Sequence, residues 1–419
     1  MRILAVICGL LLCCCFAAAK DKPATPGHAV TVPATIDHNR VVIEAEVASS
    51  SGKVERVRAW VDNGNPDLYL SRRLATALGL QISCGDKECS APPPASITIG
   101  GLSILLSDMK EAKIPLRPVN AAAVLAPGLN AEVNVPSAVL RHYDVLVDFP
   151  DRKFSLGPPG SVHFQGPSGK VLVNRENGLI QMPSQIERKK YNLALDLGAN
   201  ISFLSALVFD PLATAHPDWP RMSGAVGSAN MWGMDEEPNW KLMRLDRLQY
   251  GPLFLTNVAV VDFPQDRMEF FEKRAGVATA GLIGSQALLN YRVGIDYEHS
   301  LVYFDIGRTF NFPDFDVVGL VLRPEDDGRY TVLGVADFEG KPSVMPAATE
   351  GIGPGDHLVA VNNIPVRGAT MGQVWALLGG TPGQQKILTV ERGGKESLVG
   401  AQVRHFLAVT EDSEEKKKR

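Results

Sequence analysis

The sequence predicts a mainly β protein, with two duplicated β lobes followed by a small α/β domain. Three observations support this fold class. Short apolar runs separated by Gly/Pro turns fill most of the chain up to residue 307. Two sequence segments recur in the same order in each half of that region. After residue 310 the pattern changes to a compact mixture of strands and one short helix.

The first residues have the layout of a secretory signal peptide. Arg2 precedes an apolar run from Ile3 to Phe16, and Ala17-Ala18-Ala19 offers a small-residue cleavage site. We therefore expect residues 1–19 to be removed and the protein to be periplasmic or secreted. The run is short for a membrane span, and no later stretch is longer and equally apolar, so no integral membrane segment is expected after cleavage. Leu11-Leu12 before Cys13 lacks the small residues of a lipoprotein signal, which argues against a lipid anchor.

The charge of the chain limits the classes of molecule that it is expected to bind. The 419 residues carry a formal net charge of -4, which does not favour nucleic acid as a partner.

Residues 20–37 are rich in Pro, Ala and Thr and are expected to form a linker. From Val41 onward, apolar residues alternate with Glu44 and Glu46, which predicts a strand with one buried face.

The two halves share matched segments. Ala59 to Ser71 aligns with Leu193 to Ser205, so that Asp62 matches Asp196. Ser137 to Phe149 aligns with Ser285 to Tyr297 without a gap, and here Ser, Leu, Tyr, Val and Asp coincide. We expect one lobe over residues 38–160 and a second over 161–310, each of ordinary domain size.

Each lobe brings an aspartate to a turn at the end of an apolar strand. Asp62 is followed by Asn63 and Gly64, and Asp196 by Leu197, Gly198 and Ala199. Glycine permits the tight turn or close backbone approach that such a position needs. One Asp-x-Gly is ordinary turn chemistry. Two of them, in duplicated lobes, can face each other and share a proton, because close like charges cannot both ionise.

These motifs resemble the pepsin/retropepsin superfamily of aspartyl proteases. The resemblance covers residues 38–308 and includes Gly281-Leu-Ile-Gly284, which is similar to the motif that runs beside the second aspartate. It implies that Asp62 and Asp196 are catalytic, that a water between them attacks a peptide bond, and that neither a metal nor another cofactor is needed. The partner would then be a peptide or protein substrate.

The sequence departs from the family at two positions. The family places Thr or Ser directly after each catalytic aspartate, and those hydroxyls join the two turns. Here the residues are Asn63, which can form hydrogen bonds, and Leu197, which cannot do so through its side chain. In addition, Val133-Asn-Val-Pro136 replaces the Gly-bearing motif of the first lobe. The alternative function is therefore a catalytically inactive, peptide-binding protein with the same fold.

Two cysteines remain after signal cleavage. Cys84 and Cys89 lie in a Gly/Asp/Lys loop, and a disulfide is the expected state in an oxidising compartment. Two free thiols are the alternative. A metal site is the least favoured reading, since no second Cys/His pair completes a tetrahedron.

The segment from 311 to 403 resembles a bacterial PDZ domain. The matching residues are Pro346-Ala-Ala, Gly351-Ile-Gly-Pro-Gly-Asp356 and Leu358-Val-Ala-Val-Asn362. The resemblance places a carboxylate-binding loop at Val318, Gly319, Leu320 and Val321 and implies a C-terminal peptide as ligand. The sequence also predicts a strand over 315–322, a helix capped by Thr370, and a charged tail over 404–419.

Overall fold

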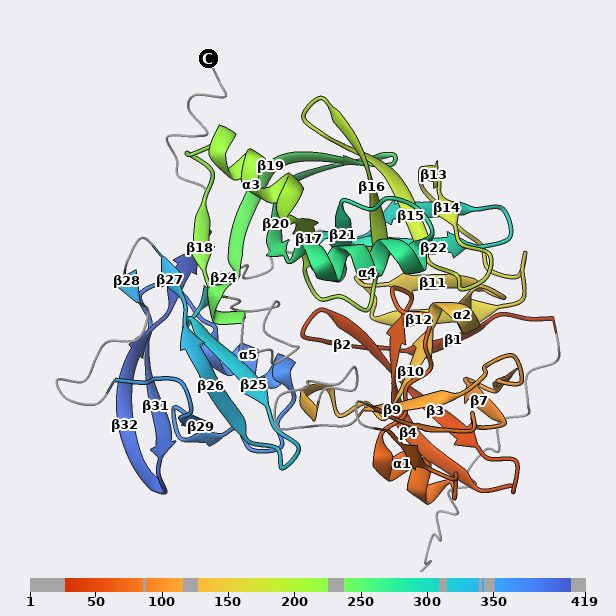
Figure 1. The fold of residues 1–419 in the computed structure, drawn as a ribbon, viewed down its shortest axis with the longest axis horizontal. Helices are drawn as coiled ribbons and strands as arrows, with labels where there is room; N and C mark the ends of the chain where they lie inside the picture. The colour runs from red at the N-terminus through yellow and green to blue at the C-terminus, as the bar shows by residue number, and fades with distance from the viewer. Residues whose placement is uncertain are drawn as a thin grey trace, which may run out of the picture.

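The structure is a computed structural model that describes residues 27–85, 88–115, 127–224, 237–308, 315–338, 341–342 and 351–407. It is mainly β, as the sequence predicts. Figure 1 shows the first lobe in red to yellow, the second in yellow-green to teal, and the C-terminal module in blue. The expected signal peptide lies outside the described residues. No helix among the described residues is both long enough and apolar enough to cross a membrane.

One six-stranded sheet joins the two lobes. Its strands, in spatial order, are β1 (Val30–Pro33), β12 (Lys153–Gly157), β11 (Asp144–Asp148), β22 (Tyr291–Asp296), β23 (Leu301–Ile306) and β13 (Ser168–Lys170). The central pair, β11 and β22, is the second duplicated segment of the sequence. They run antiparallel, with Leu146 opposite Gly294 and Asp148 opposite Arg292. Because the sequence repeat also aligns Leu146 with Gly294, this register relates the two lobes by a pseudo-twofold axis through that pair.

The first lobe is built on a second sheet. Its strands, in spatial order, are β10 (Val133–Pro136), β4 (Val54–Asp62), β3 (Arg40–Ala48), β7 (Ser96–Ile99) and β8 (Leu102–Leu105), and β2 (Thr35–Asp37) also pairs with β3. In β3 the apolar residues from Val41 to Val47 are buried while Glu44 and Glu46 are exposed, as the alternation predicts. The lobe also contains the elements β5 (Ser83–Cys84), β6 (Glu88–Ala91), β9 (Ala112–Pro115), α1 (Arg72–Ala77), α2 (Ser137–Leu140) and η1 (Pro127–Leu129).

The second lobe is organised around a ten-stranded sheet. The order is β14 (Leu172–Val173), β15 (Ile180–Ile186), β16 (Lys189–Asp196), β21 (Gly281–Gly284), β17 (Ser202–Ser205), β20 (Leu253–Phe263), β19 (Lys241–Tyr250), β18 (Arg221–Ser223), β27 (Asp337–Phe338) and β28 (Lys341–Pro342). The helical elements are α3 (Ala206–Ala215), η3 (Glu237–Asn239), α4 (Gln265–Ala275) and η4 (Ser285–Leu288).

The C-terminal module has its own curved sheet and one helix. The sheet order is β25 (Leu320–Pro324), β26 (Tyr330–Val335), β29 (His357–Val361), β31 (Gln385–Arg392) and β32 (Lys395–Gln402), with β30 (Ile364–Pro365) paired to β29. The helix α5 (Met371–Leu378) begins at a capping box between Thr370 and Gln373, as the sequence predicts from Thr370. A separate ribbon pairs β24 (Phe315–Val317) with β33 (Arg404–Phe406).

Three boundaries differ from the sequence expectation. The expected linker over 20–37 is wrong from Val30 onward, because β1 pairs with β12 and β2 with β3. The expected tail is wrong at 404–406, which form β33, and the expected strand over 315–322 is broken between Val317 and Leu320. Strands β1 and β33 gain their hydrogen bonds from β12 and β24, which are distant in the sequence, and β2 pairs with the adjacent β3. Local composition alone does not reveal these pairings.

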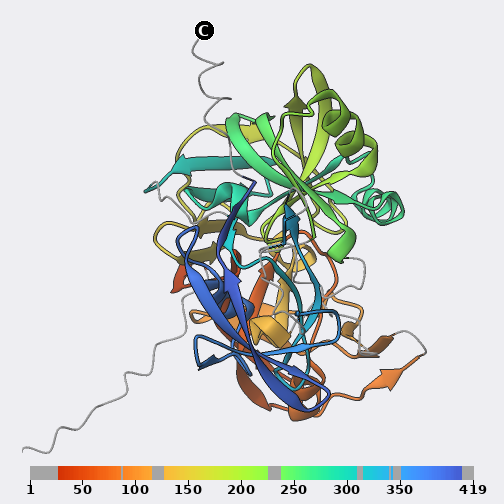
Figure 2. The same ribbon diagram turned by 90° about the vertical axis from the view of Figure 1, so that its left-hand side faces the viewer.

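The C-terminal module is packed against both lobes. Figure 2, viewed from its side, shows the blue strands in front of the lobes. The N–H of Gly372 in α5 donates to Asp37 Oδ1 at 2.9 Å, and Arg244 Nε donates to the carbonyl of Leu407 at 2.8 Å. Strand β27 also extends the sheet of the second lobe through β18. The module is therefore part of one continuous body.

Candidate active site

The two aspartates end equivalent strands in the two lobes. In the first lobe, β10 runs parallel to β4 and places Pro136 beside Asp62. In the second lobe, β21 runs parallel to β16 and places Gly284 beside Asp196. The Val-Asn-Val-Pro segment thus takes the position in the first lobe that Gly-Leu-Ile-Gly takes in the second. The duplicated motif of the sequence is a duplicated structural unit.

The structure brings Asp62 and Asp196 together at the boundary between the lobes. A methyl group built on Gly64 would collide with the carboxyl group of Asp196, and one built on Gly198 would collide with that of Asp62. Each aspartate therefore contacts the glycine of the opposite turn, which is what a pseudo-twofold axis between the turns requires. The close approach explains why both positions need glycine. Both aspartates are buried, with exposures of 3% and 8%.

Asn63 joins the two turns through its side-chain amide. Its Nδ2 donates to the carbonyl of Leu195 at 2.8 Å, and its Oδ1 accepts from the N–H of Leu197 at 2.7 Å. Both bonds cross from the first lobe to the second and are buried. The amide, with one donor end and one acceptor end, thus connects the two turns across the boundary between the lobes.

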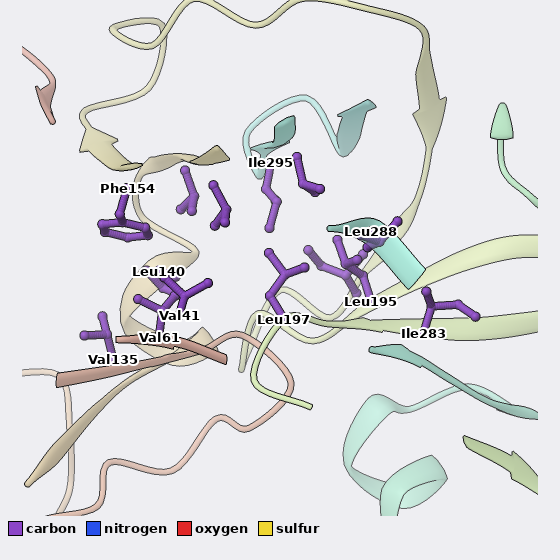
Figure 3. Close-up of a cluster of buried hydrophobic side chains, with 14 of the residues drawn as sticks. Val41, Val61, Val135, Leu140, Phe154, Leu195, Leu197, Ile283, Leu288 and Ile295 are labelled. Carbon is purple, nitrogen blue, oxygen red and sulfur yellow. The ribbon is translucent and has the colours of Figure 1, made fainter. Parts of the chain in front are cut away.

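Leu197 joins the lobes by a different interaction. Its side chain is fully buried in the apolar core. Figure 3 shows Leu197 between a group from the first lobe, which includes Val61 and Leu140, and a group from the second, which includes Ile283 and Ile295. Leu197 therefore contributes apolar packing between the two lobes.

The two carboxylates have unequal hydrogen bonding. Asp196 Oδ1 accepts from the N–H groups of Gly198 and Ala199, both at 2.9 Å. Asp62 Oδ2 has one long contact, 3.5 Å from Asn134 Nδ2. Since backbone donors stabilise an anion, Asp196 is the better site for the negative charge.

The electrostatics of the site agree with this asymmetry. Burial, and then the negative charge of Asp196, raise the pKa of Asp62 well above its usual range. Burial raises the pKa of Asp196 to about 6, and its two backbone hydrogen bonds and Arg40 oppose the rise. A pair of this kind holds one proton at mildly acidic pH, with the proton on Asp62.

Two polar neighbours of the aspartates were not expected from the sequence. Asn134 lies in the segment that replaces the Gly-bearing motif, and its Oδ1 accepts from the N–H of Tyr69 at 2.7 Å while its Nδ2 faces Asp62. Arg40, at the start of β3, is 1% exposed. The only signal for Asn134 was a polar residue inside an apolar strand. Arg40 offered no signal, because an arginine before an alternating strand is ordinarily solvated.

The remaining sequence-derived positions lie elsewhere. Val318 and Gly319 lie between β24 and β25, Leu320 and Val321 begin β25, and all four residues are buried. The N–H of Val318 donates to the carbonyl of Leu378, and that of Leu320 to the carbonyl of Val318. The amides of Val318 and Leu320 are therefore engaged within the module.

The two remaining cysteines lie opposite each other. Cys84 and Cys89 form a disulfide that joins β5 to β6 in the first lobe. In the described part of the chain, no group of three or more His, Cys, Asp or Glu side chains could hold a metal ion.

Comparison with known proteins gives a limited result. No protein-family model and no curated protein matches the sequence. Among solved structures, the chain is similar to the aspartic proteinase from Irpex lacteus. That similarity has 12% sequence identity and a TM-score of 0.40, and it covers 67% of this chain and 97% of that chain.

Proposed function

We propose that this protein is an aspartic-type endopeptidase that uses a water molecule between Asp62 and Asp196. The observation that carries the proposal is the crosswise packing of the two turns, in which Gly64 contacts Asp196 and Gly198 contacts Asp62. Such packing supports a shared proton, because two carboxyl groups that lie close together cannot both ionise. The cross-lobe bonds of Asn63 support it, because they hold the two turns in fixed register.

The reaction follows from the unequal carboxylates. Ionised Asp196 takes a proton from the water while the water oxygen bonds to the carbon of the scissile peptide. Protonated Asp62 gives its proton to the carbonyl oxygen, which yields a neutral tetrahedral intermediate. Asp196 then gives its proton to the nitrogen while ionised Asp62 takes one hydroxyl proton back from the intermediate. The C–N bond breaks, an amine and a carboxylic acid are released, and the pair returns to its starting protonation state. The substrate is a peptide or protein, and no cofactor takes part in these steps.

A non-catalytic peptide-binding role is the second candidate, and burial of the aspartates favours it. One apolar cluster includes Trp60 and Ala199, which neighbour the aspartates, together with Leu129 and the core of the C-terminal module. In this arrangement the carboxyl groups have little contact with solvent. Catalysis therefore requires that the module, or the elements beneath it, move to admit a substrate.

Hydrolysis assays distinguish the two candidates. We expect the full chain to cleave an unfolded protein substrate at mildly acidic pH, and a statine-type inhibitor to block cleavage. Asp62→Asn and Asp196→Asn should each lose activity by at least about 100-fold, since each removes one half of the acid–base pair. Asp151→Asn is the matched control, because Asp151 is exposed. Cleavage that survives in both site variants contradicts the proposal, and peptide binding without turnover supports the second candidate.

We further propose that the C-terminal module is PDZ-like and adds a peptide to β25, which is the edge strand of its sheet. In that binding mode the peptide lies between β25 and α5. Gly128 of η1 lies against Met371 of α5 and Pro324 of β25, at one end of this groove. A ligand must therefore compete with η1 there. Fluorescence anisotropy with a library of C-terminal peptides tests this, and equal binding of the same peptides with amidated C-termini contradicts carboxylate recognition.

We also propose that the protein is exported, on the strength of the apolar run that follows Arg2 and the Ala17-Ala18-Ala19 site. The disulfide between Cys84 and Cys89 is suited to an oxidising compartment. N-terminal sequencing of the protein recovered from a bacterial periplasm or medium tests this proposal. A mature chain that retains residues 2–19 contradicts it.

A further inference from the structure

Arg40 is a cation buried beside the two aspartates. Its Nε donates to the carbonyl of Gly198 at 2.8 Å, across the boundary between the lobes. Its guanidinium carbon lies 5.7 Å from the centre of the Trp60 ring. Trp60 precedes Asp62 by two positions in the sequence. Its Nη1 is buried and has no hydrogen-bond acceptor within the described part of the chain. Burying a guanidinium with an unpaired N–H costs free energy. A role in holding the two lobes together therefore does not by itself explain the position of Arg40.

The Gly198–Ala199 peptide links Arg40 to Asp196. The carbonyl of this peptide accepts from Arg40 Nε, and its N–H donates to Asp196 Oδ1 at 2.9 Å. A cation at the carbonyl end polarises the amide and strengthens its N–H as a donor. Arg40 thus acts on Asp196 in two ways, through this peptide and directly through its charge.

We propose that Arg40 is a positioning residue that fixes Asp196 as the ionised member of the pair and leaves the shared proton on Asp62. The proposal rests on the proposed peptidase function for its catalytic meaning. The first turn has no equivalent arrangement among the described residues, since the hydrogen bond to the Asp62 carboxylate comes from a side chain, Asn134, at 3.5 Å and not from the backbone of its own turn. The repeat is therefore symmetric in its backbone and asymmetric in the hydrogen bonds that its two carboxylates accept.

Other charged groups around the pair are accounted for. Arg40 faces Asp37 from β2 and Glu237 from η3 as well as both aspartates, and these carboxylates partly offset the cost of its burial. Arg40 and, to a smaller extent, Arg274 of α4 also favour the charged form of Asp62, but burial and the charge of Asp196 outweigh them. Tyr250 of β19 lies near Asp196, and burial followed by the charge of Asp196 raises its pKa, so it stays neutral. Arg40 is the one cation that acts on Asp196 in this set.

The pH profile of Arg40 variants tests the assignment. The acid limb of kcat/KM reports ionisation of the carboxylate that activates water. Loss of the cation in Arg40→Met should raise the pKa of Asp196 and shift the acid limb to higher pH by about one unit. Arg40→Lys keeps the charge but loses the planar contact with the Gly198 carbonyl, so its limb should lie between those of Arg40→Met and wild type. Arg56→Met, on an exposed ion pair with Glu44, is the matched control and should leave the limb in place.

A second readout separates this proposal from the proposed function. Carbon-13 NMR of the aspartate carboxyl groups, with Asp196 assigned by its loss in Asp196→Asn, follows its titration without any need for turnover. We expect its midpoint to rise in Arg40→Met and, by less, in Arg40→Lys, even if no substrate is cleaved. If Arg40→Met does not fold, the Asp196 titration midpoint in Arg40→Lys tests the proposal. An unchanged Asp196 midpoint in a folded variant, or a uniform loss of activity with the limb in place, overturns the proposal.

Discussion

Replacement of Asn63 by alanine removes both hydrogen bonds that join the two turns. Asn63 is 1% exposed, and its amide uses Nδ2 at 2.8 Å and Oδ1 at 2.7 Å toward the backbone at Leu195 and Leu197. Each bond contributes about 1 kcal/mol, and a buried partner left without one costs about 1–3 kcal/mol. With two backbone groups affected, we expect the free energy of unfolding to fall by roughly 2–4 kcal/mol.

Urea unfolding of the full chain, followed by tryptophan fluorescence, measures this change. The midpoint should fall while the slope stays constant, because the loss acts on the native state. Asn192→Ala is the matched control. Asn192 lies in β16 and makes one 3.2 Å bond to the carbonyl of Ala278 in a more exposed setting, so its removal should cost less than about 1 kcal/mol. Equal effects of the two substitutions would refute the inference that Asn63 holds the lobes together.

Three further predictions concern the same site. Leu197→Thr introduces the hydroxyl of the resembling family into an apolar core, and it should lower the free energy of unfolding by about 2 kcal/mol in the same urea experiment. Gly64→Ala and Gly198→Ala should each reduce kcat/KM by about 100-fold or more, because the added methyl group displaces an aspartate. Gly353→Ala is the control and should leave kcat/KM unchanged, because the methyl group there meets only one arginine side chain. The pKa of Asp196, about 6 in the folded protein, lies above that of an unfolded aspartate, so its contribution to stability is complete below pH 4 and lost as the pH rises through 6. That loss should amount to about 3 kcal/mol between pH 4 and 7 and should be smaller in Asp196→Asn.

Each prediction has an outcome that contradicts it. A Leu197→Thr protein as stable as wild type would show that the core between the lobes accommodates a hydroxyl. Activity retained in Gly64→Ala or Gly198→Ala would show that the opposite aspartates do not contact these turns during catalysis. A stability that stays flat from pH 4 to 7 would show that Asp196 ionises freely in the folded state.

Much of the fold followed from the sequence, because its signals are local or repeated. Alternation in β3 comes from residues that share one pleated face, and Thr370 caps α5 through Gln373 three residues later. The aspartates could be identified because each ends an apolar strand in a repeated segment, and a repeat is visible without a structure.

The sequence by itself determined the strand pattern, the duplication, and Asp62 and Asp196 as the candidate pair. Only the tertiary structure decided how the pair is supported. Asn63 meets Leu195 across 132 positions of sequence, and Arg40 meets Gly198 across 158. It also decided that the C-terminal module packs against the lobes. Such contacts depend on which strands pair and where each turn points, and neither is encoded in the local pattern of residues around any one of these positions.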